Sequence, residues 1–111
     1  MPDGGQVKTC TWTGISGKQY EYGIYPIGTS FVAKPGNYVH AKVSGLGRWS
    51  AVYIGETEDL STRFENHHAA HCIARNGATH IHVHLSSADR QVRLNEETDL
   101  RRSHNTPCNK Q

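Results

Sequence analysis

The stretch SAVYIGETEDLSTR, residues 50–63, decides the fold. Its first part, residues 50–55, is rich in β-branched and aromatic side chains and predicts a strand that ends at a glycine. Asp59 is a suitable N-cap for a helix that begins at the next residue. One face of that helix would be formed by residues spaced four apart, Leu60, Phe64 and His68. The stretch therefore predicts a strand that leads through a short loop into a helix.

Three further strands are predicted upstream of this stretch. Residues 7–13 and 20–27 are rich in β-forming residues and flank a turn signal at Gly14-Ile15-Ser16-Gly17. Residues 37–43 form the third candidate, and they are expected to pair with residues 50–55 in a hairpin with a somewhat long turn. The upstream half of the chain therefore predicts two hairpins.

Downstream, we expect helical character to continue, with or without a break, to Arg75 and to stop at Asn76-Gly77. Residues 78–85 alternate apolar and polar side chains, which is typical of a strand. Ser86 or Ser87 is expected to cap a final helix that ends near His104. Pro107 would prevent any continuation of that helix.

The order of these elements, ββ-ββ-α-β-α, predicts an α+β fold in which helices pack on an antiparallel β-sheet. A chain of 111 residues suits one compact domain. We expect residues 1–33 to form an added N-terminal β-hairpin and residues 34–111 to form the core.

Composition limits the possible partners and compartments. The formal net charge is only +2, so a nucleic-acid-binding face would have to be local. No apolar run is long enough for a membrane helix or a signal peptide, so we expect no membrane partner. The odd number of widely spaced cysteines predicts reduced thiols in a cytoplasmic protein, at Cys10, Cys72 and Cys108.

The strand at residues 78–85 has three histidines on one face, His80, His82 and His84. Alternate side chains along one strand lie about 7 Å apart. Bonds to zinc are about 2.1 Å long, so one ion cannot easily gather all three rings. We therefore expect a polar strand face that packs under a helix or lies near nucleic acid.

Four features of the chain carry chemistry, namely Tyr53-Ile54-Gly55, the Arg63/His67 pair one helical turn apart, the carboxylates Glu96 and Glu97, and the terminal segment Thr106-Pro107-Cys108-Asn109. A phenol, a guanidinium, an imidazole and a carboxylate suit the hydrolysis of a phosphodiester. That reaction needs a base for water, cations for the developing charge, and an oxygen ligand for a hard metal ion. Periodicity does not decide between Glu96 and Glu97.

Pro35-Gly36-Asn37-Tyr38, then Tyr53-Ile54-Gly55, then Glu58 to Arg63 with His67, and finally Glu97 and Asn109 resemble the GIY-YIG nuclease family in order and spacing. The resemblance covers residues 36–109. A literal Gly23-Ile24-Tyr25 also occurs, but Tyr25 lies 28 residues before Tyr53, whereas Tyr38 lies 15 before it. A tight hairpin favours Tyr38 as the first-motif tyrosine.

The resemblance implies a metal-dependent endonuclease that hydrolyses nucleic acid, with DNA as the expected polymer. It implies that Tyr38 is the general base or positions the water, and that Tyr53 is its partner. It implies that Arg63 neutralises the scissile phosphate and that His67 assists the tyrosine.

Two further roles are implied at the C-terminal end. Glu97 would hold one Mg²⁺ or Mn²⁺ ion, and Asn109 would fix the site. The chain departs from the family at Asn37, where an apolar residue is usual, and at Glu56, where many relatives carry lysine or a small residue. The alternative is a catalytically inactive module of the same fold that binds nucleic acid or a protein. The sequence identifies no partner protein.

Overall fold

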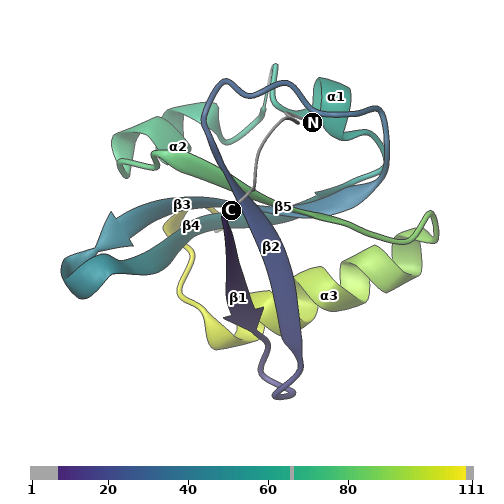
Figure 1. Ribbon diagram of the computed structural model, residues 1–111, viewed down its shortest axis with the longest axis horizontal. Coiled ribbons are helices and arrows are strands. Elements are labelled where there is room, and N and C mark those ends of the chain that lie inside the picture. Colours follow the sequence, from purple (N-terminus) through teal and green to yellow (C-terminus); the bar gives the residue numbers. More distant parts are fainter. Residues whose placement is uncertain (1–7, 66, 110–111) are drawn as a thin grey trace.

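Five antiparallel strands form one sheet in the order β1-β2-β5-β3-β4 (Figure 1). In this computed structural model, which describes residues 8–65 and 67–109, the strands are β1 (Thr9–Thr13), β2 (Gln19–Pro26), β3 (Gly36–Ser44), β4 (Arg48–Thr57) and β5 (His80–Leu85). Every predicted strand is confirmed. The β3–β4 pair is a long hairpin closed by a 3₁₀ turn, η1 (Gly45–Gly47).

The helices lie on both faces of the sheet, as Figure 1 shows, with α1 and α2 on one side and α3 on the other. Their bounds are α1 (Leu60–Arg63), α2 (Ala70–Arg75) and α3 (Arg90–Ser103), and a 3₁₀ turn, η2 (Pro107–Asn109), follows. The predicted α+β class, with helices packed on an antiparallel sheet, is confirmed.

Strand alternation divides the core into two clusters, one on each face. The face under α1 and α2 buries Tyr25, Phe31, Tyr38, Tyr53, Leu60 and Ile81. The face under α3 buries Trp12, Tyr22, Val39, Ile54 and Leu100. Because β3 and β4 contribute alternate residues to both clusters, they are buried on both sides, and this fixes the orientation of Tyr38 and Tyr53.

The helical region after β4 is broken into two short helices. The predicted N-cap is confirmed, since the Asp59 carboxylate accepts a hydrogen bond of 2.9 Å from the Ser61 N–H. The predicted stop is also confirmed, since Gly77 follows α2 with a φ of 79°. The final helix begins later than expected, because the cap is Asp89 rather than Ser86 or Ser87. Ser87 instead accepts a hydrogen bond from the Asp89 N–H.

The N-terminal hairpin extends the sheet, because β2 pairs directly with β5. Its turn is attached to α3 by Asp99, whose carboxylate accepts hydrogen bonds from the Ser16 N–H, the Ser16 hydroxyl and the Tyr20 hydroxyl at 2.8–2.9 Å. These bonds hold the pKa of Asp99 below its ordinary value. The hairpin and α3 therefore support each other.

The histidine face of β5 packs as expected, with a different contact at each position. His82 is fully buried, and its Nδ1 accepts a hydrogen bond of 3.0 Å from the Trp12 indole N–H. His84 lies 2.9 Å from the Glu96 carboxylate of α3. His80 contacts Thr79 and the ring of Trp49. The prediction of a polar strand face packed under a helix is confirmed at His82 and His84.

The prediction of three reduced thiols is wrong for two of them. Cys72 of α2 and Cys108 of η2 form a disulfide with Cα atoms 5.6 Å apart, and Cys10 is a free thiol. Sequence spacing hid this pair, because the two cysteines are 36 residues apart and meet only through the tertiary fold. The thiol argument for a cytoplasmic protein therefore no longer holds. Within the described ranges, the structure contains no helix of the length and hydrophobicity needed to cross a membrane.

Candidate active site at the edge strand

Tyr38 and Tyr53 lie on adjacent antiparallel strands, as the sequence predicts. Tyr38 is paired with Gly55, and Tyr53 with His40, so all four positions share one face. The two phenol rings are stacked with centroids 6.0 Å apart. Tyr25 lies on the same face but on β2, where it is paired with Ile81 of β5 and packs edge-on against Phe31. Tyr38, and not Tyr25, is therefore the tyrosine next to Tyr53.

Gly55 lies directly beneath the ring of Tyr38. A Cβ atom at this position would lie 2.6 Å from both Cζ and Oη of Tyr38 and 2.8 Å from the ring of Tyr53. Contacts of this length do not occur between a real Cβ and its neighbours, so a larger residue would displace a phenol. Glycine is therefore required at this position for a steric reason, because only a residue without a Cβ lets the Tyr38 ring pack over β4.

His67 is hydrogen-bonded to Tyr38, with Nε2 2.8 Å from the hydroxyl oxygen. Its other nitrogen, Nδ1, accepts a hydrogen bond of 3.0 Å from the Ala69 N–H. Burial lowers the pKa of His67 to about 4, so the ring is neutral near pH 7 and carries its single proton on Nε2. Nε2–H therefore donates to Tyr38, which makes His67 a donor to the phenol and not an acceptor of its proton.

Two more histidines join this cluster. His68 stacks on His67 and lies 3.3 Å from the Tyr53 hydroxyl through Nε2. His40 is buried between Tyr38 and Tyr53, and burial lowers its pKa to about 3. Our sequence reasoning did not select His40, although its position two residues after Tyr38 on one strand indicates a shared face.

Burial also raises the pKa of both tyrosines. For Tyr38 the neighbouring Tyr53 acts in the same direction, and the positive charge of Arg63 opposes it. For Tyr53 the Glu97 carboxylate adds to the increase, and Arg63 again opposes it. Both hydroxyls are therefore protonated in the free protein at neutral pH. Arg63 follows β4 in α1 and Glu97 belongs to α3, and these two helices lie on opposite faces of the sheet. Both charged groups are nevertheless close enough to shift the pKa of the two phenols.

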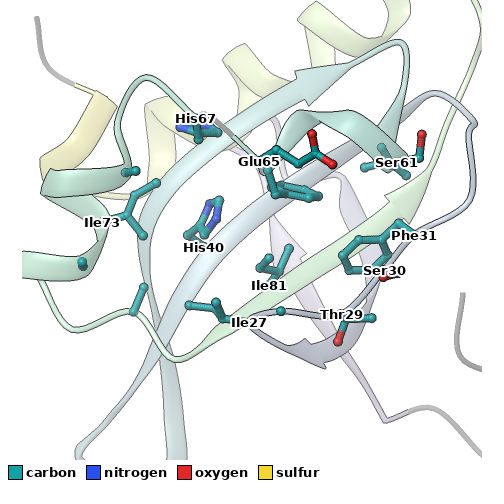
Figure 2. A pocket seen from close by; sticks show the side chains of 16 residues that line it. Ile27, Thr29, Ser30, Phe31, His40, Ser61, Glu65, His67, Ile73 and Ile81 are labelled. Carbon is teal, nitrogen blue, oxygen red and sulfur yellow. The ribbon is translucent and has the colours of Figure 1, made fainter.

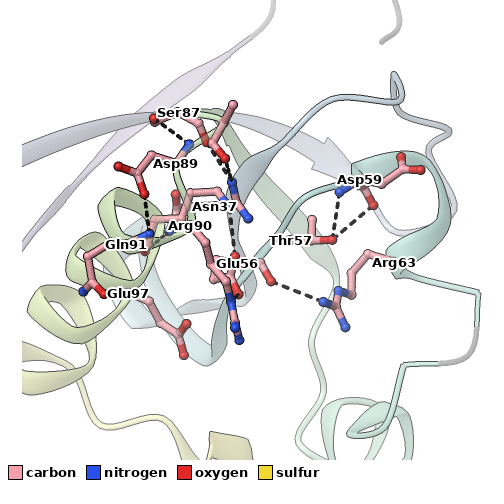
Figure 3. Close-up of polar contacts among 12 residues, drawn as sticks. Asn37, Glu56, Thr57, Asp59, Arg63, Ser87, Asp89, Arg90, Gln91 and Glu97 are labelled. Carbon is pink, nitrogen blue, oxygen red and sulfur yellow. Dashed lines mark hydrogen bonds and ion pairs between the residues drawn. The ribbon is translucent and has the colours of Figure 1, made fainter.

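Arg63, at the end of α1, is a half-buried cation. Its only hydrogen bond to the described residues runs from Nη2 to the Glu56 carbonyl at 3.4 Å (Figure 3). Its Nε is buried and has no partner in residues 8–65 and 67–109. Within those residues no carboxylate forms an ion pair with it, so the guanidinium keeps the capacity to bind an anion.

The carboxylate of Glu56 is neutralised from the other face of the sheet. The buried Arg93 donates to it from Nε at 2.8 Å, and Arg90 lies 3.7 Å from it (Figure 3). Arg93 also donates to the carbonyls of Ser87 and Ala88. Glu56, which differs from the GIY-YIG pattern, is therefore part of an ion pair and does not add an unpaired negative charge to the site.

Asn37 is the other residue that differs from the GIY-YIG pattern, and its side chain has a partner on the face of the sheet that α3 covers. Its side-chain N–H donates to the Arg93 carbonyl at 2.9 Å, where an apolar residue could not.

The two adjacent carboxylates of α3 have different surroundings. Glu96 is buried and accepts hydrogen bonds from the Tyr22 hydroxyl and from His84, so it belongs to the core. Glu97 lies on the side of α3 toward β4, and its only described partner is Arg101 at 3.4 Å. Burial raises the pKa of Glu97. Both hydrogen bonds of Glu96 fall on its Oε2, but its side chain is only 6% exposed against 16% for Glu97, so Glu97 is the more accessible of the two to a ligand.

These residues offer few ligands for a metal ion. No group of three or more His, Cys, Asp or Glu side chains that could hold a metal ion is present among the described residues. Magnesium keeps several waters and is commonly held by one or two carboxylates plus substrate phosphate. The single half-buried carboxylate of Glu97, with its incomplete hydrogen bonding, fits that kind of site.

Asn109 is bound to the backbone of β4. Its Oδ1 accepts from the Ile54 N–H and its Nδ2 donates to the Ile54 carbonyl, each at 2.8 Å. The side chain thereby occupies the free edge of β4 between Tyr53 and Gly55, and both of its polar groups are used. Asn109 is thus placed to hold the Tyr53-Ile54-Gly55 segment of β4 in position. Its polar atoms form no hydrogen bond with Tyr38 or Tyr53 among the described residues.

No protein-family model, curated protein or solved structure matches this chain.

Proposed function

We propose that the protein is a GIY-YIG-type endonuclease that hydrolyses phosphodiester bonds in nucleic acid at the edge strand β4. The observation that carries the proposal is the Arg63 guanidinium, which has no ion-pair partner among the described residues and lies beside two buried tyrosines. The half-buried guanidinium keeps a buried Nε–H without a partner among the described residues, and a phosphate would supply both an acceptor and the missing charge. The resemblance of residues 36–109 to that family supports the same conclusion.

In the proposed reaction, Arg63 binds the scissile phosphate and stabilises the charge that develops on its oxygens. Tyr38 positions the attacking water, and the Nε2–H of His67 holds the phenol oxygen in place. To act as the base, Tyr38 first loses its own proton to solvent in the substrate complex, and the resulting phenolate then accepts the proton of the attacking water. Burial raises the pKa of Tyr38, so this step requires added positive charge in the substrate complex. Arg63 already acts in that direction.

Glu97 would hold one Mg²⁺ or Mn²⁺ ion. When bound, such an ion supplies positive charge that lowers the pKa of nearby groups and stabilises phosphoryl oxygens. Asn109 keeps Tyr53 and Gly55 in register by its two bonds to Ile54.

A second candidate is an inactive module that binds nucleic acid through Arg63. The raised pKa values of Tyr38 and Tyr53 favour it, because a phenol that stays protonated binds phosphate but does not accept a proton from water. The two candidates share the phosphate site and differ in whether Glu97 matters.

The test is a cleavage assay on single-stranded, branched and duplex DNA and on RNA, with and without Mg²⁺ or Mn²⁺. We expect metal-dependent cleavage that Glu97→Gln and Arg63→Ala each reduce by about 100-fold or more. The matched control is Glu21→Gln, an exposed carboxylate of β2 that undergoes the same charge change. Glu96→Ala is unsuitable as a control, because it would remove the buried partner of Tyr22 and His84.

Full activity in Glu97→Gln would contradict the metal assignment. Absence of cleavage from every substrate, together with binding that Arg63→Ala weakens and Glu97→Gln does not, would support the inactive module.

A further inference from the structure

A cavity of about 640 Å³ opens on the face of the sheet that carries α1 and α2 (Figure 2). Its floor is His40 of β3 and Ile81 of β5, and its walls are the two helices and the segment 27–31. Sites for small organic ligands have volumes of about 300–1,000 Å³. The cavity is therefore large enough to hold a ring system.

The cavity adjoins the candidate active site and shares His40 with it. The ring of Phe64 lies between them, with its centroid 5.0 Å from that of Tyr38 and 5.6 Å from that of His40. His67 borders both, since it lines the cavity and is hydrogen-bonded to Tyr38.

The charges of the cavity exclude an anionic ligand. Its walls are mainly apolar, and among the described residues no lysine or arginine lines it. The only acidic side chain is Glu65, which is exposed at the edge. A phosphate or a carboxylate would meet no cation there and would be repelled by Glu65. A cation would meet only the solvent-exposed Glu65 and would lose its hydration against the apolar walls, so we expect the part of the ligand that enters to be uncharged.

The floor carries unused hydrogen-bonding capacity. His40 is only 5% exposed, and its Nδ1 is buried and has no partner in residues 8–65 and 67–109, so a ligand in the cavity pairs with this atom only when the imidazole turns toward it. The lowered pKa keeps the ring neutral, so it presents one N–H and one lone pair. Buried polar atoms are nearly always paired in native proteins, and each exception calls for an explanation. A purely aliphatic ligand would leave this imidazole unpaired.

We propose that this cavity binds an uncharged heteroaromatic ring, such as a purine base, that packs against Phe31 and Phe64 and forms a hydrogen bond with His40. Aromatic walls favour flat rings, and the neutral imidazole matches the paired donors and acceptors of a heterocycle. The ring has two possible sources, a free nucleoside or an unpaired base of a nucleic-acid strand. The second source rests on the proposed function.

The six isoleucines of the chain provide the test. Ile27, Ile73 and Ile81 line the cavity, whereas Ile15, Ile24 and Ile54 lie elsewhere. The protein is labelled at the isoleucine δ1 methyl groups and titrated, without divalent metal, with deoxyadenosine and separately with a short single-stranded oligodeoxynucleotide. We expect NMR shifts at the three cavity methyls and none at the other three.

Two variants test the position of the ligand. Ala74→Phe fills the cavity from the exposed side of α2 and should abolish the shifts, whereas His71→Phe, exposed on the same helix but outside the cavity, should leave them unchanged. His40→Phe keeps an aromatic ring at this position, although a larger one, and removes both nitrogens. It should weaken deoxyadenosine binding by about 3- to 10-fold, the effect of one neutral hydrogen bond.

The two probes distinguish the sources. Shifts with deoxyadenosine alone assign the cavity to a free heterocycle, and shifts with both probes assign it to a base in a strand as well. Absence of shifts with both probes, or equal shifts in Ala74→Phe, would overturn the inference. Because no cleavage is measured, failure of the nuclease proposal would leave this result intact.

Discussion

At the scale of single residues, Gly55 leaves no room for a side chain. In Gly55→Ala the new methyl group would lie 2.6 Å from the Tyr38 hydroxyl, so the phenol must move out of its bond with His67. We expect the free energy of unfolding to fall by about 1–3 kcal/mol, as for other overpacked sites. Nucleic-acid cleavage should fall far more than this stability loss explains. Urea unfolding and the cleavage assay measure the two effects.

Gly45→Ala is the matched control, since a Cβ at Gly45 meets no atom within 4 Å. Equal activity of the two variants would show that the position of Tyr38 does not matter for the reaction.

Three buried histidines predict acid sensitivity. Burial lowers the pKa of His40 to about 3 and those of His67 and His82 to about 4, from an ordinary value of 6.5. Above pH 6.5 both folded and unfolded chains leave these rings neutral. Below it only the unfolded chain binds protons, so stability falls as the pH drops from about 6.5 toward 4. The slope approaches about 1.4 kcal/mol per pH unit for each ring.

Urea unfolding at pH 7, 6 and 5 measures this slope. His40→Phe should reduce it by the share of one ring, whereas the exposed His71→Asn should not change it. A stability that is constant from pH 7 to pH 5 would contradict the burial of these rings.

Tyr38, Tyr53 and Arg63 were selected through the resemblance to the GIY-YIG family, and the hairpin predicted from the sequence accounts for the adjacency of the two tyrosines. Periodicity does not separate Glu96 from Glu97, since both border the apolar face of α3. Their difference depends on Tyr22, which is 74 residues from Glu96 and becomes its partner only in the folded chain.

At the scale of elements, every strand was predictable because alternation is a short-range pattern. The break between α1 and α2 was less clear, since His67 and His68 leave the helix to reach the tyrosines and no proline or glycine marks the place. The prediction placed the N-cap of α3 too early, because serine and aspartate are both good N-cap residues. In the structure it is Asp89 whose carboxylate accepts a hydrogen bond from the Gln91 N–H.

The disulfide joins α2 to η2 and yields a prediction about stability. Reduction of Cys72–Cys108 opens a loop of 36 residues in the unfolded chain, which should lower the free energy of unfolding by about 3–4 kcal/mol. The mass of the native protein should increase by two hydrogen atoms on reduction. Mass spectrometry and thermal melting with and without a dithiol reductant measure these effects.

Cys10→Ala should behave as the parent protein in this experiment, because Cys10 is a free thiol. An unchanged mass after reduction would show that the two cysteines are thiols, as the sequence alone suggested.

For the whole molecule, the net charge of +2 predicts weak and largely sequence-independent binding to nucleic acid. On duplex DNA each phosphate contacted by lysine or arginine contributes about 0.9 to the slope of log affinity against log salt. Arg63→Ala should therefore reduce that slope by about one unit, while Lys18→Ala, on the distant β1–β2 turn, should not. Fluorescence anisotropy at several salt concentrations measures it, and an affinity independent of salt would contradict a phosphate contact.

The position of β5 has a consequence for synthesis on the ribosome. This strand is the last to be made, yet it lies in the middle of the sheet, between β2 and β3. Until residue 85 has emerged, the β1–β2 and β3–β4 hairpins have no link through hydrogen bonds, and isolated hairpins are marginal in water. The nascent chain must therefore carry two open strand edges, at β2 and β3, and these edges can pair with other chains before β5 arrives to cover them.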